Sequence, residues 1–363
     1  MFLAALVPIL TVIHAAGDRH FDFGVFYYAA HMVLDGSRHS LYDLGVQRAF
    51  QARFHRPPQL LFYYPPYALI PFLCIAVLPI ELAFSLWTAA SLIVLVWSIQ
   101  LLAKASGVRY GNMPVLLSLA FAPVAANLAN GQVSLMIVGV YVLTYALWRD
   151  ERRFLGGAVL AIATFKFQLV LGFVAVLMLK RKWRELAGFS SGCALLFVLS
   201  VLVAGISWLR VYPVFLRYNE VAGSEPRAMA NWRGLMSLAG GNHLWLLAGL
   251  SVVTILWAAY AWTNLDRGFS SAVLATMLVS YHFHPQDLSL LLVPFFLSRK
   301  DGVLPAAKLP MVAFLLLLLP MALGAVNAPY ALLAIALAAA LVWIGLPTRR
   351  ASLARGLSAG SCS

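Results

Sequence analysis

Charged side chains are scarce in this chain of 363 residues: they make up 11% of the sequence, with 13 Asp and Glu against 26 Lys and Arg. An ordinary soluble domain carries about 25% charged residues. Apolar residues reach 62%. They form repeated runs of roughly 17 to 25 residues, long enough to cross about 30 Å of hydrocarbon as helices. The composition excludes an ordinary soluble protein and indicates an all-α integral membrane protein, with residues 1–363 as a single transmembrane domain.

Cysteine is also rare, and its three positions, Cys74, Cys193 and Cys362, are far apart. This spacing indicates neither a disulfide framework nor a cysteine metal motif. The net charge of +13 does not indicate nucleic acid, because the basic residues form short runs between apolar segments. Basic residues in such places orient a membrane protein. We therefore expect membrane lipids around the chain and no nucleic-acid partner.

Twelve apolar segments are expected to form the membrane helices. They span residues 2–16, 61–79, 82–103, 113–127, 131–148, 154–179, 185–206, 243–263, 270–281, 287–298, 309–325 and 329–346. The first has no basic region before it, so we expect a retained helix and not a signal peptide. Two long loops, 17–60 and 207–242, interrupt the series, and a basic tail, 347–363, follows it. Within the first loop, amphipathic pieces at 24–35 and 42–56 are expected along the membrane surface.

Connections rich in Arg and Lys predict which helix ends are cytoplasmic. They lie at 149–153, 180–184, 299–308 and 349–355. If the first two are both inside, residues 154–179 form a hairpin turning near Lys166, and the proline-interrupted segment 61–79 is re-entrant. In the alternative, both segments cross once and 149–153 lies outside. Both versions place the same connections on the outer face, namely 17–60, 207–242, 282–286 and 326–328.

The segment from Asp18 to Ala30 is the richest cluster of ionisable groups in the chain. Asp18 and Asp22 stand four residues apart, so in a helix both carboxylates point to one side, beside Arg19 and His20. One interpretation is that Asp22 takes part in chemistry, with Asp18 as the substitute. The other is that these groups solvate the end of a membrane helix. Five of the other acidic residues flank basic runs or lie in short connections, namely Asp150, Glu151, Glu185, Asp266 and Asp301. Asp22 lies instead on the expected outer face beside aromatic residues, which favours the first interpretation.

Lys166 lies in the middle of an apolar run, where a charge costs about 2.5–3.5 kcal/mol on insertion scales. It is either a functional residue or a structural one, held by snorkelling or by an ion pair. A second polar break contains Asn127, Asn130, Gly131 and Gln132. A plain turn needs only the Asn-Gly pair, so Gln132 is left unexplained by a structural role.

The third break runs from Tyr281 to Asp287 and contains His282 and His284. A zinc site needs at least three well-placed ligands, so histidine binding of a phosphate or a hydroxyl is the favoured interpretation. The outer loop 207–242 carries Asn231 and Arg233 and is too long to be a simple connection. Aromatic residues around Tyr64 form either an interfacial belt or part of a site.

Taken in order, these segments resemble the GT-C glycosyltransferases, in particular glycosyltransferase family 87. The resemblance rests on short motifs in a shared order: Asp22 to Ala30, Leu34-Asp35-Gly36, Leu41-Tyr42-Asp43, Tyr64-Pro65-Pro66, Pro71, Leu78-Pro79, Asn130-Gly131-Gln132, Lys166 with Gln168, the region of Asn231, and His284 with Asp287-Leu288 and the leucine run to Pro294. It implies a GT-C fold, a polyprenyl-phosphate-mannose donor, α-mannosyl transfer, and a catalytic base in the first outer loop at the position of Asp22. The lysine and asparagine segments depart from the family pattern after Gln168 and Asn231.

A donor linked through phosphate to a lipid brings its own leaving group, so the reaction needs a base for the acceptor hydroxyl and cations for the phosphate. The candidates for the phosphate are Lys166, Arg233, His282 and His284. The candidates for the sugar or the acceptor are Tyr28, Tyr64, Asn130, Gln132, Gln168, Asn231 and Asp287. A single displacement on a β-linked donor yields an α-linked product.

We therefore expect an enzyme of the cell membrane, with its site on the periplasmic or extracellular face and a lipid or glycan acceptor. A transporter, which would show inverted repeats, is one alternative. A membrane acyltransferase or glycan polymerase is another, because it would share the polar outer loops. No metal ligand set and no certain cofactor is predicted. The sequence leaves open the acceptor, the sugar and a divalent metal.

Overall fold

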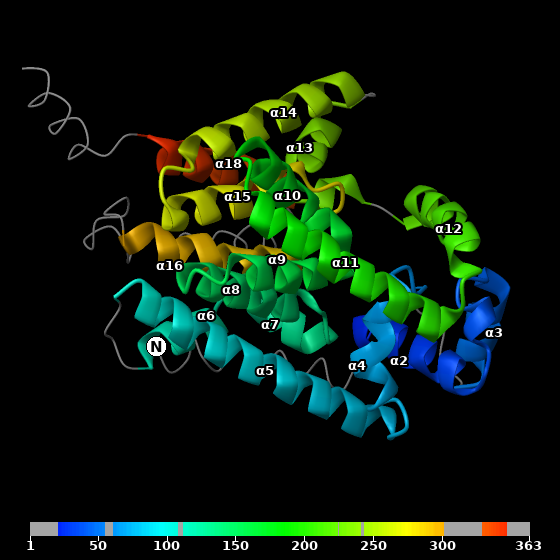
Figure 1. The fold of residues 1–363 in the computed structure, drawn as a ribbon. Coiled ribbons are helices and arrows are strands. Elements are labelled where there is room, and N and C mark those ends of the chain that lie inside the picture. The colour runs from blue at the N-terminus through cyan, green and yellow to red at the C-terminus, as the bar shows by residue number, and fades with distance from the viewer. Residues whose placement is uncertain are drawn as a thin grey trace, which may run out of the picture.

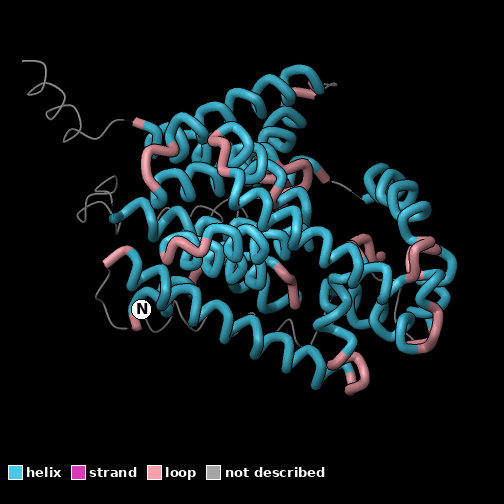
Figure 2. The backbone as a smooth tube through the Cα atoms, viewed as in Figure 1, coloured by secondary structure: helices cyan, strands magenta, loops and turns pink. Residues whose placement is uncertain are grey.

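A computed structural model describes residues 21–54, 61–107, 112–223, 225–240, 243–300 and 329–346. Within these ranges the regular structure is helical and contains no strand (Figure 2). The expected all-α class is therefore confirmed. The predicted helices 2–16 and 309–325, the substitute base Asp18 and the tail 347–363 lie outside the described residues.

The helices follow the apolar segments of the sequence, broken at glycine, proline and polar residues. The α-helices are α2 (Phe21–Leu34), α3 (Leu44–Ala52), α4 (Ile70–Leu73), α5 (Ile80–Ala105), α6 (Met113–Leu119), α7 (Ala122–Asn130), α8 (Ser134–Arg149), α9 (Arg153–Leu160), α10 (Leu171–Leu179), α11 (Trp183–Ala204), α12 (Trp208–Gly223), α13 (Trp232–Leu238), α14 (Leu244–Ala261), α15 (Leu265–Val279), α16 (Leu292–Lys300) and α18 (Leu333–Gly345). Short 3₁₀ helices are η1 (Arg38–Ser40), η2 (Pro66–Leu69), η3 (Ala161–Leu169), η4 (Pro226–Ala228), η5 (Pro285–Leu291) and η7 (Tyr330–Leu332).

Two groups of buried apolar side chains hold these helices together. The larger group fills the bundle and includes Tyr141, Phe173 and Phe269. The smaller group joins α2, α3 and the segment around α4, where the rings of Phe26 and Phe72 stack with centroids 4.6 Å apart. In Figure 1, α2, α3, α4 and α12 gather at the right-hand end of the bundle. The described part of the first long loop, residues 21–54, thus folds into a helical cap on one end of the bundle.

Three described helices are long and apolar enough to cross a membrane: α5, α11 and α14. The count rises to five if each of two bent pairs is one span, namely α6 with α7, and Arg153–Leu169 with α10. Other predicted segments form shorter helices, such as the 16-residue α8. The described residues therefore show several apolar membrane helices but do not confirm twelve.

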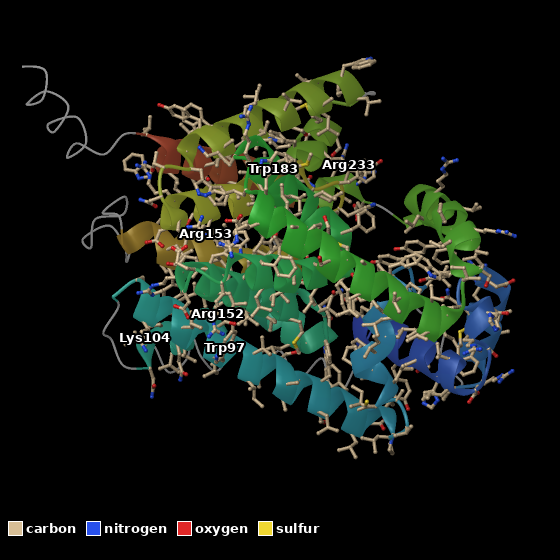
Figure 3. All side chains as sticks on the ribbon, viewed as in Figure 1. Trp97, Lys104, Arg152, Arg153, Trp183 and Arg233 are labelled. Carbon is tan, nitrogen blue, oxygen red and sulfur yellow. The ribbon has the colours of Figure 1, made fainter. Side chains whose placement is uncertain are left out.

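Residues 154–179 do not form one straight helix. The direction changes by 117° between Arg153–Leu169 and Leu171–Leu179. The start of this segment lies near the start of α11, since Arg153 Nη1 lies 3.9 Å from Glu185 Oε1 in the first turn of that helix. Figure 3 shows Lys104 and Arg152 together, away from Arg233. The bend fits either a broken span or a re-entrant hairpin.

The segment 61–79 contains only η2, the one-turn α4 and turns, because Pro65, Pro66 and Pro71 interrupt any longer helix. It is therefore not a spanning helix. The predicted amphipathic helix at 24–35 is wrong in one respect: α2 is buried on all sides from Phe23 to Ala30. It is covered by α3, α4 and α7. By contrast, α3 has a buried face with Phe50 and exposed residues such as Arg48, as an amphipathic helix should.

Candidate active site

A break between α7 and α8 sets the position of Gln132. Helix α7 ends at Asn130, and Gly131 adopts a left-handed conformation with φ of +64°. A Cβ at this position would lie 2.6 Å from the Cβ of Phe23 on α2, so only glycine allows the two segments to come this close. The Asn-Gly-Gln motif therefore brings Gln132 and Ser134, at the start of α8, next to the N-terminal end of α2.

Lys166 enters this region from a second break, inside η3. Its backbone has a non-helical φ of −118° and ψ of 79°, and its side chain is only 4% exposed. The ammonium Nζ donates to Asp287 Oδ1 at 2.8 Å, to Ser134 Oγ at 3.0 Å and to Gln132 Oε1 at 3.2 Å. The buried charge is thus paired and fully hydrogen-bonded, as burial requires.

Asp287 comes from a third break, residues 280–287, which run from the end of α15 into the first turn of η5, and its side chain is 1% exposed. Its Oδ2 accepts from the backbone N–H of His284 at 3.1 Å, which closes the first turn of η5. Its Oδ1 accepts from Lys166 and from Ser134, the latter at 2.5 Å. Both carboxylate oxygens are therefore engaged inside the protein.

Asp22 is partly exposed and lies in the first turn of α2. Its carboxyl forms a side-chain hydrogen bond with Gln132. Burial raises the pKa of this carboxyl, whereas the bond to Gln132 and the charge of Lys166 lower it, and burial dominates. The phenols of Tyr63 and Tyr64 are within electrostatic reach of Asp22. Asp22 is thus the exposed member of a buried polar network, with an elevated affinity for a proton.

Residues 280–287 also join the two histidines and the long loop 207–242 to this network. Asn231 Nδ2 donates to the carbonyl of Ser280 at 2.6 Å, and Arg233 Nη1 donates to that of Tyr281 at 3.1 Å. The guanidinium of Arg233 also lies 3.9 Å from the centroid of the Tyr281 ring, a cation–π contact.

The two imidazoles of this loop stack with centroids 6.4 Å apart. Burial lowers the pKa of His284, and the charges of Lys166 and His282 lower it further, against the opposing effect of Asp287. His284 is therefore neutral near pH 7 and acts as a hydrogen-bonding group.

Four further residues were predicted for the site: Tyr64, Asn130, Gln168 and Tyr28. Tyr64 is buried, with its ring 4.6 Å from that of Phe26 on α2. Asn130, next to Gly131, and Gln168, two residues after Lys166, are both partly exposed. The ring of Tyr28 packs against those of Tyr27 and Phe54. The structure therefore joins Asp22, Gln132, Lys166 and Asp287 directly.

Two residues of the network were not among the predicted site residues. Ser134 bridges Lys166 and Asp287, and a serine at a helix start is easily taken for a cap. Asn127 donates through Nδ2 to the carbonyls of Pro123 at 2.9 Å and of Gln286 at 2.7 Å, tying α7 to the loop 280–287. The available signal was its place in the second polar break, four residues before Gly131, and the structure shows it to be buried at 1% exposure.

The potential metal ligands near this site are the side chains of His282, His284 and Asp287. In the described part of the chain, no group of three or more His, Cys, Asp or Glu side chains is placed to hold a metal ion. His282, His284 and Asp287 do not form such a group, since Asp287 turns its oxygens toward Lys166, Ser134 and the backbone of His284. The loop instead presents nitrogen donors, which suit an anion.

The comparisons with known proteins identify the family. The family model of glycosyltransferase family 87 matches residues 62–294, which include Gln132, Lys166, Arg233 and Asp287. The match begins after Asp22, so it does not include the proposed base. No curated protein and no solved structure gave a significant match. Because the family model covers well over half of the chain and several helices are apolar enough to span a membrane, the chain belongs to glycosyltransferase family 87 and is a membrane glycosyltransferase.

Proposed function

We propose that the chain transfers a hexose, mannose, from a polyprenyl-phosphate donor to a lipid or glycan acceptor, with inversion at the anomeric carbon. Asp22 acts as the general base. The reaction takes place on the periplasmic or extracellular face of the cell membrane. The observation that carries this proposal is the position of Asp22 at the edge of the buried network of Gln132, Lys166 and Asp287. Asp22 is partly exposed, and burial raises the pKa of its carboxyl.

The base must take a proton from the acceptor hydroxyl as the new bond to the anomeric carbon forms. A carboxylate with an elevated pKa is the better proton acceptor, provided that it is ionised at the working pH. The first-turn position of Asp22 favours the ionised form, because the free N–H groups of a helix start attract negative charge. Gln132 holds the carboxyl by its side-chain bond. Together these contacts support a fixed, basic carboxylate at the edge of the site.

The leaving group is the lipid phosphate, which carries away negative charge and needs no proton. Arg233, which bonds to the carbonyl of Tyr281, and the stacked imidazoles of His282 and His284 would supply donors to the phosphate oxygens. Arginine offers a planar fork that matches a phosphate. Lys166 supplies a nearby positive charge, but all three of its N–H bonds are taken, so direct contact with phosphate requires it to release one protein partner.

The sugar and the acceptor occupy the space between Asp22 and the loop 280–287. We assign Asn130, Gln132 and Gln168 to the sugar or the acceptor by their positions before α8 and in η3, and Tyr64 by its position just before η2. Asn231 holds the start of the loop by its bond to Ser280. Tyr28 contributes by packing against Tyr27 and Phe54. A divalent metal is not part of this proposal.

The test is transfer of radiolabelled mannose from polyprenyl-phosphate mannose by the purified, detergent-solubilised chain to a membrane lipid extract. We expect labelled lipid or glycan with the wild-type chain. We expect turnover to be about 10²–10⁴-fold lower with Asp22→Asn, since a general base contributes about that much. Donor binding, measured by equilibrium dialysis, should be largely retained, because Asp22 is not a phosphate ligand.

Asp35→Asn is the matched control, since Asp35 is exposed just after the same helix. It should transfer at the wild-type rate. Normal turnover in Asp22→Asn would refute the assigned base. A lack of transfer from any lipid-linked sugar would refute the proposed reaction and leave transport or acyl transfer as the alternative.

A further inference from the structure

The pair formed by Lys166 and Asp287 has a property that phosphate or sugar binding does not explain. Both side chains are almost completely buried, at 4% and 1% exposed. Every N–H bond of the ammonium and both oxygens of the carboxylate have protein partners. A group whose bonding capacity is filled by the protein is poorly placed to bind substrate directly. Asp287 therefore needs a different role from the substrate contact that its sequence motif predicts.

The pair acts on Asp22 through Gln132. The amide of Gln132 has one acceptor, Oε1, and one donor group, Nε2. Lys166 donates to Oε1, so Nε2 is the end left to face the carboxyl of Asp22. Rotating the amide by 180° would bring Nε2 against the ammonium and Oε1 against the carboxylate, with repulsion at both contacts. Lys166 thus fixes the direction in which Gln132 donates.

Charge balance gives the second part of the argument. A single lysine within about 4–6 Å of a carboxyl lowers its pKa by about 1–3 and so weakens it as a base. Here the ammonium is paired with Asp287 at 2.8 Å, and the two charges act on Asp22 in opposite directions. Asp287 thus offsets part of the effect of Lys166 on the pKa of Asp22, and burial is the largest single influence on that pKa.

We propose that Asp287 is a positioning residue for Asp22: it anchors Lys166 so that Gln132 donates to the base, and it offsets the charge of Lys166 there. This inference rests on the proposed role of Asp22. It assigns to Asp287 control over the strength of the base and no contact with the substrate.

Other titratable groups near the base are few in the described residues. Those that face Asp22 are Lys166 of η3, Asp287 of η5, and Tyr63 and Tyr64 of the segment before η2. His284 lies next to Asp287. The charged side chains of the cap that also packs on α2 are exposed to solvent: Asp35, Arg38, His39, Asp43, Arg48 and Arg53. The pair is therefore the main charge acting on Asp22 from the protein interior.

The experiment measures the pH dependence of kcat/KM for mannose transfer in the full-length wild-type chain, Asp287→Asn and Lys166→Met. Asp287→Asn leaves the lysine charge uncompensated, so we expect the acid limb of the profile to move to lower pH by about 1 pH unit. Lys166→Met leaves the carboxylate uncompensated and should move the acid limb to higher pH. A merely structural role would lower the rate in both variants without moving the limb in opposite directions.

Ser134→Ala is the matched control, because it removes a contact to both members of the pair without changing any charge. Its acid limb should stay at the wild-type position. Shifts in the same direction in Asp287→Asn and Lys166→Met, an unmoved limb in both, or an equal shift in Ser134→Ala would overturn the inference.

If Asp287→Asn is too slow to assay, infrared difference spectra can follow the C=O stretch of protonated Asp22, with Asp22→Asn as the blank. If Asp22 takes up its proton at the same pH in Asp287→Asn as in the wild-type chain, the inference is overturned as well. Failure of the proposed function is distinguishable, because it would appear as normal turnover in Asp22→Asn, whatever the pH profiles of the other variants.

Discussion

Two groups of buried charged side chains in the described residues lie near the two ends of α15. The loop 280–287 after α15 joins the network of Gln132, Lys166, Asp287 and Asp22. In the first turn of α15, Asp266 and Arg267 are each 8% exposed. The hydroxyl of Tyr145 donates to Asp266, and Arg267 Nε donates to the carbonyl of Ile344 at 3.0 Å, near the end of α18. This second group, Asp266 and Arg267, joins α15 to α8 and α18 through these hydrogen bonds.

The two groups differ in what their charges face. Arg267 bonds to the carbonyls of Ile344 and Leu346, which are fixed backbone acceptors at the C-terminal end of a helix, where a cation is favoured. The network around Lys166 ends instead at Asp22, which is partly exposed and has a raised pKa. Burial of a charge alone is therefore a weak sign of function. A partly exposed carboxyl held by a buried ion pair is a stronger one.

The largest expected difference between the two groups is in activity. Asp22→Asn should lower turnover by about 10²–10⁴-fold. Asp266→Asn should leave turnover unchanged and lower the free energy of unfolding by about 1.5–3 kcal/mol, as expected for loss of a hydrogen bond to a charged group. Turnover and denaturation in detergent check both. Loss of turnover in a well-folded Asp266→Asn would break the comparison.

A second test concerns the glycine that places Gln132. Gly131→Ala requires a left-handed backbone for alanine and places its Cβ 2.6 Å from Phe23, so we expect a loss of about 1–3 kcal/mol together with reduced turnover. Gly249→Ala, on α14, is the control, because its added Cβ meets no atom within 4 Å. It should be neutral or slightly stabilising. Thermal unfolding and transfer assays on both variants would measure these effects.

A third test removes the cation of the second group. Arg267→Met leaves the carbonyls of Ile344 and Leu346 without this donor, and each buried unsatisfied group costs about 1–3 kcal/mol. We expect lower thermal stability at unchanged kcat. Limited proteolysis near residue 346 should become faster. Reduced kcat at full stability would show that this end of α15 also serves the reaction.

The smallest effect is on stability as a function of pH. Because burial raises the pKa of Asp22, the folded state holds this proton to higher pH than the unfolded state does. Stability is therefore lost as pH rises through the folded pKa, and the loss persists above it. Asp22→Asn has no such group, so its melting temperature should exceed that of the wild type by more at pH 8 than at pH 4. An equal difference at both pH values would contradict the direction of the pKa shift.

The candidate site could be predicted in part because polar residues are costly inside apolar helices. Lys166, Gln132 and Asp287 were visible in the sequence for that reason, and the structure joins them. Ser134 was not visible, because one hydroxyl group costs little and carries no distinct pattern. The pairing of Lys166 with Asp287 joins residues 121 positions apart, and composition says nothing about such contacts.

By itself, the sequence determined the all-α membrane class, since repeated apolar runs can satisfy their backbone hydrogen bonds in a membrane only as helices. It also determined where the helices break, because glycine, proline and polar residues interrupt them at 131, 166 and 280–287. Only the tertiary structure decided that 154–179 is bent, that α2 is buried on all sides, and that the breaks meet around Asp22. Those outcomes depend on packing between distant segments, which no local pattern encodes.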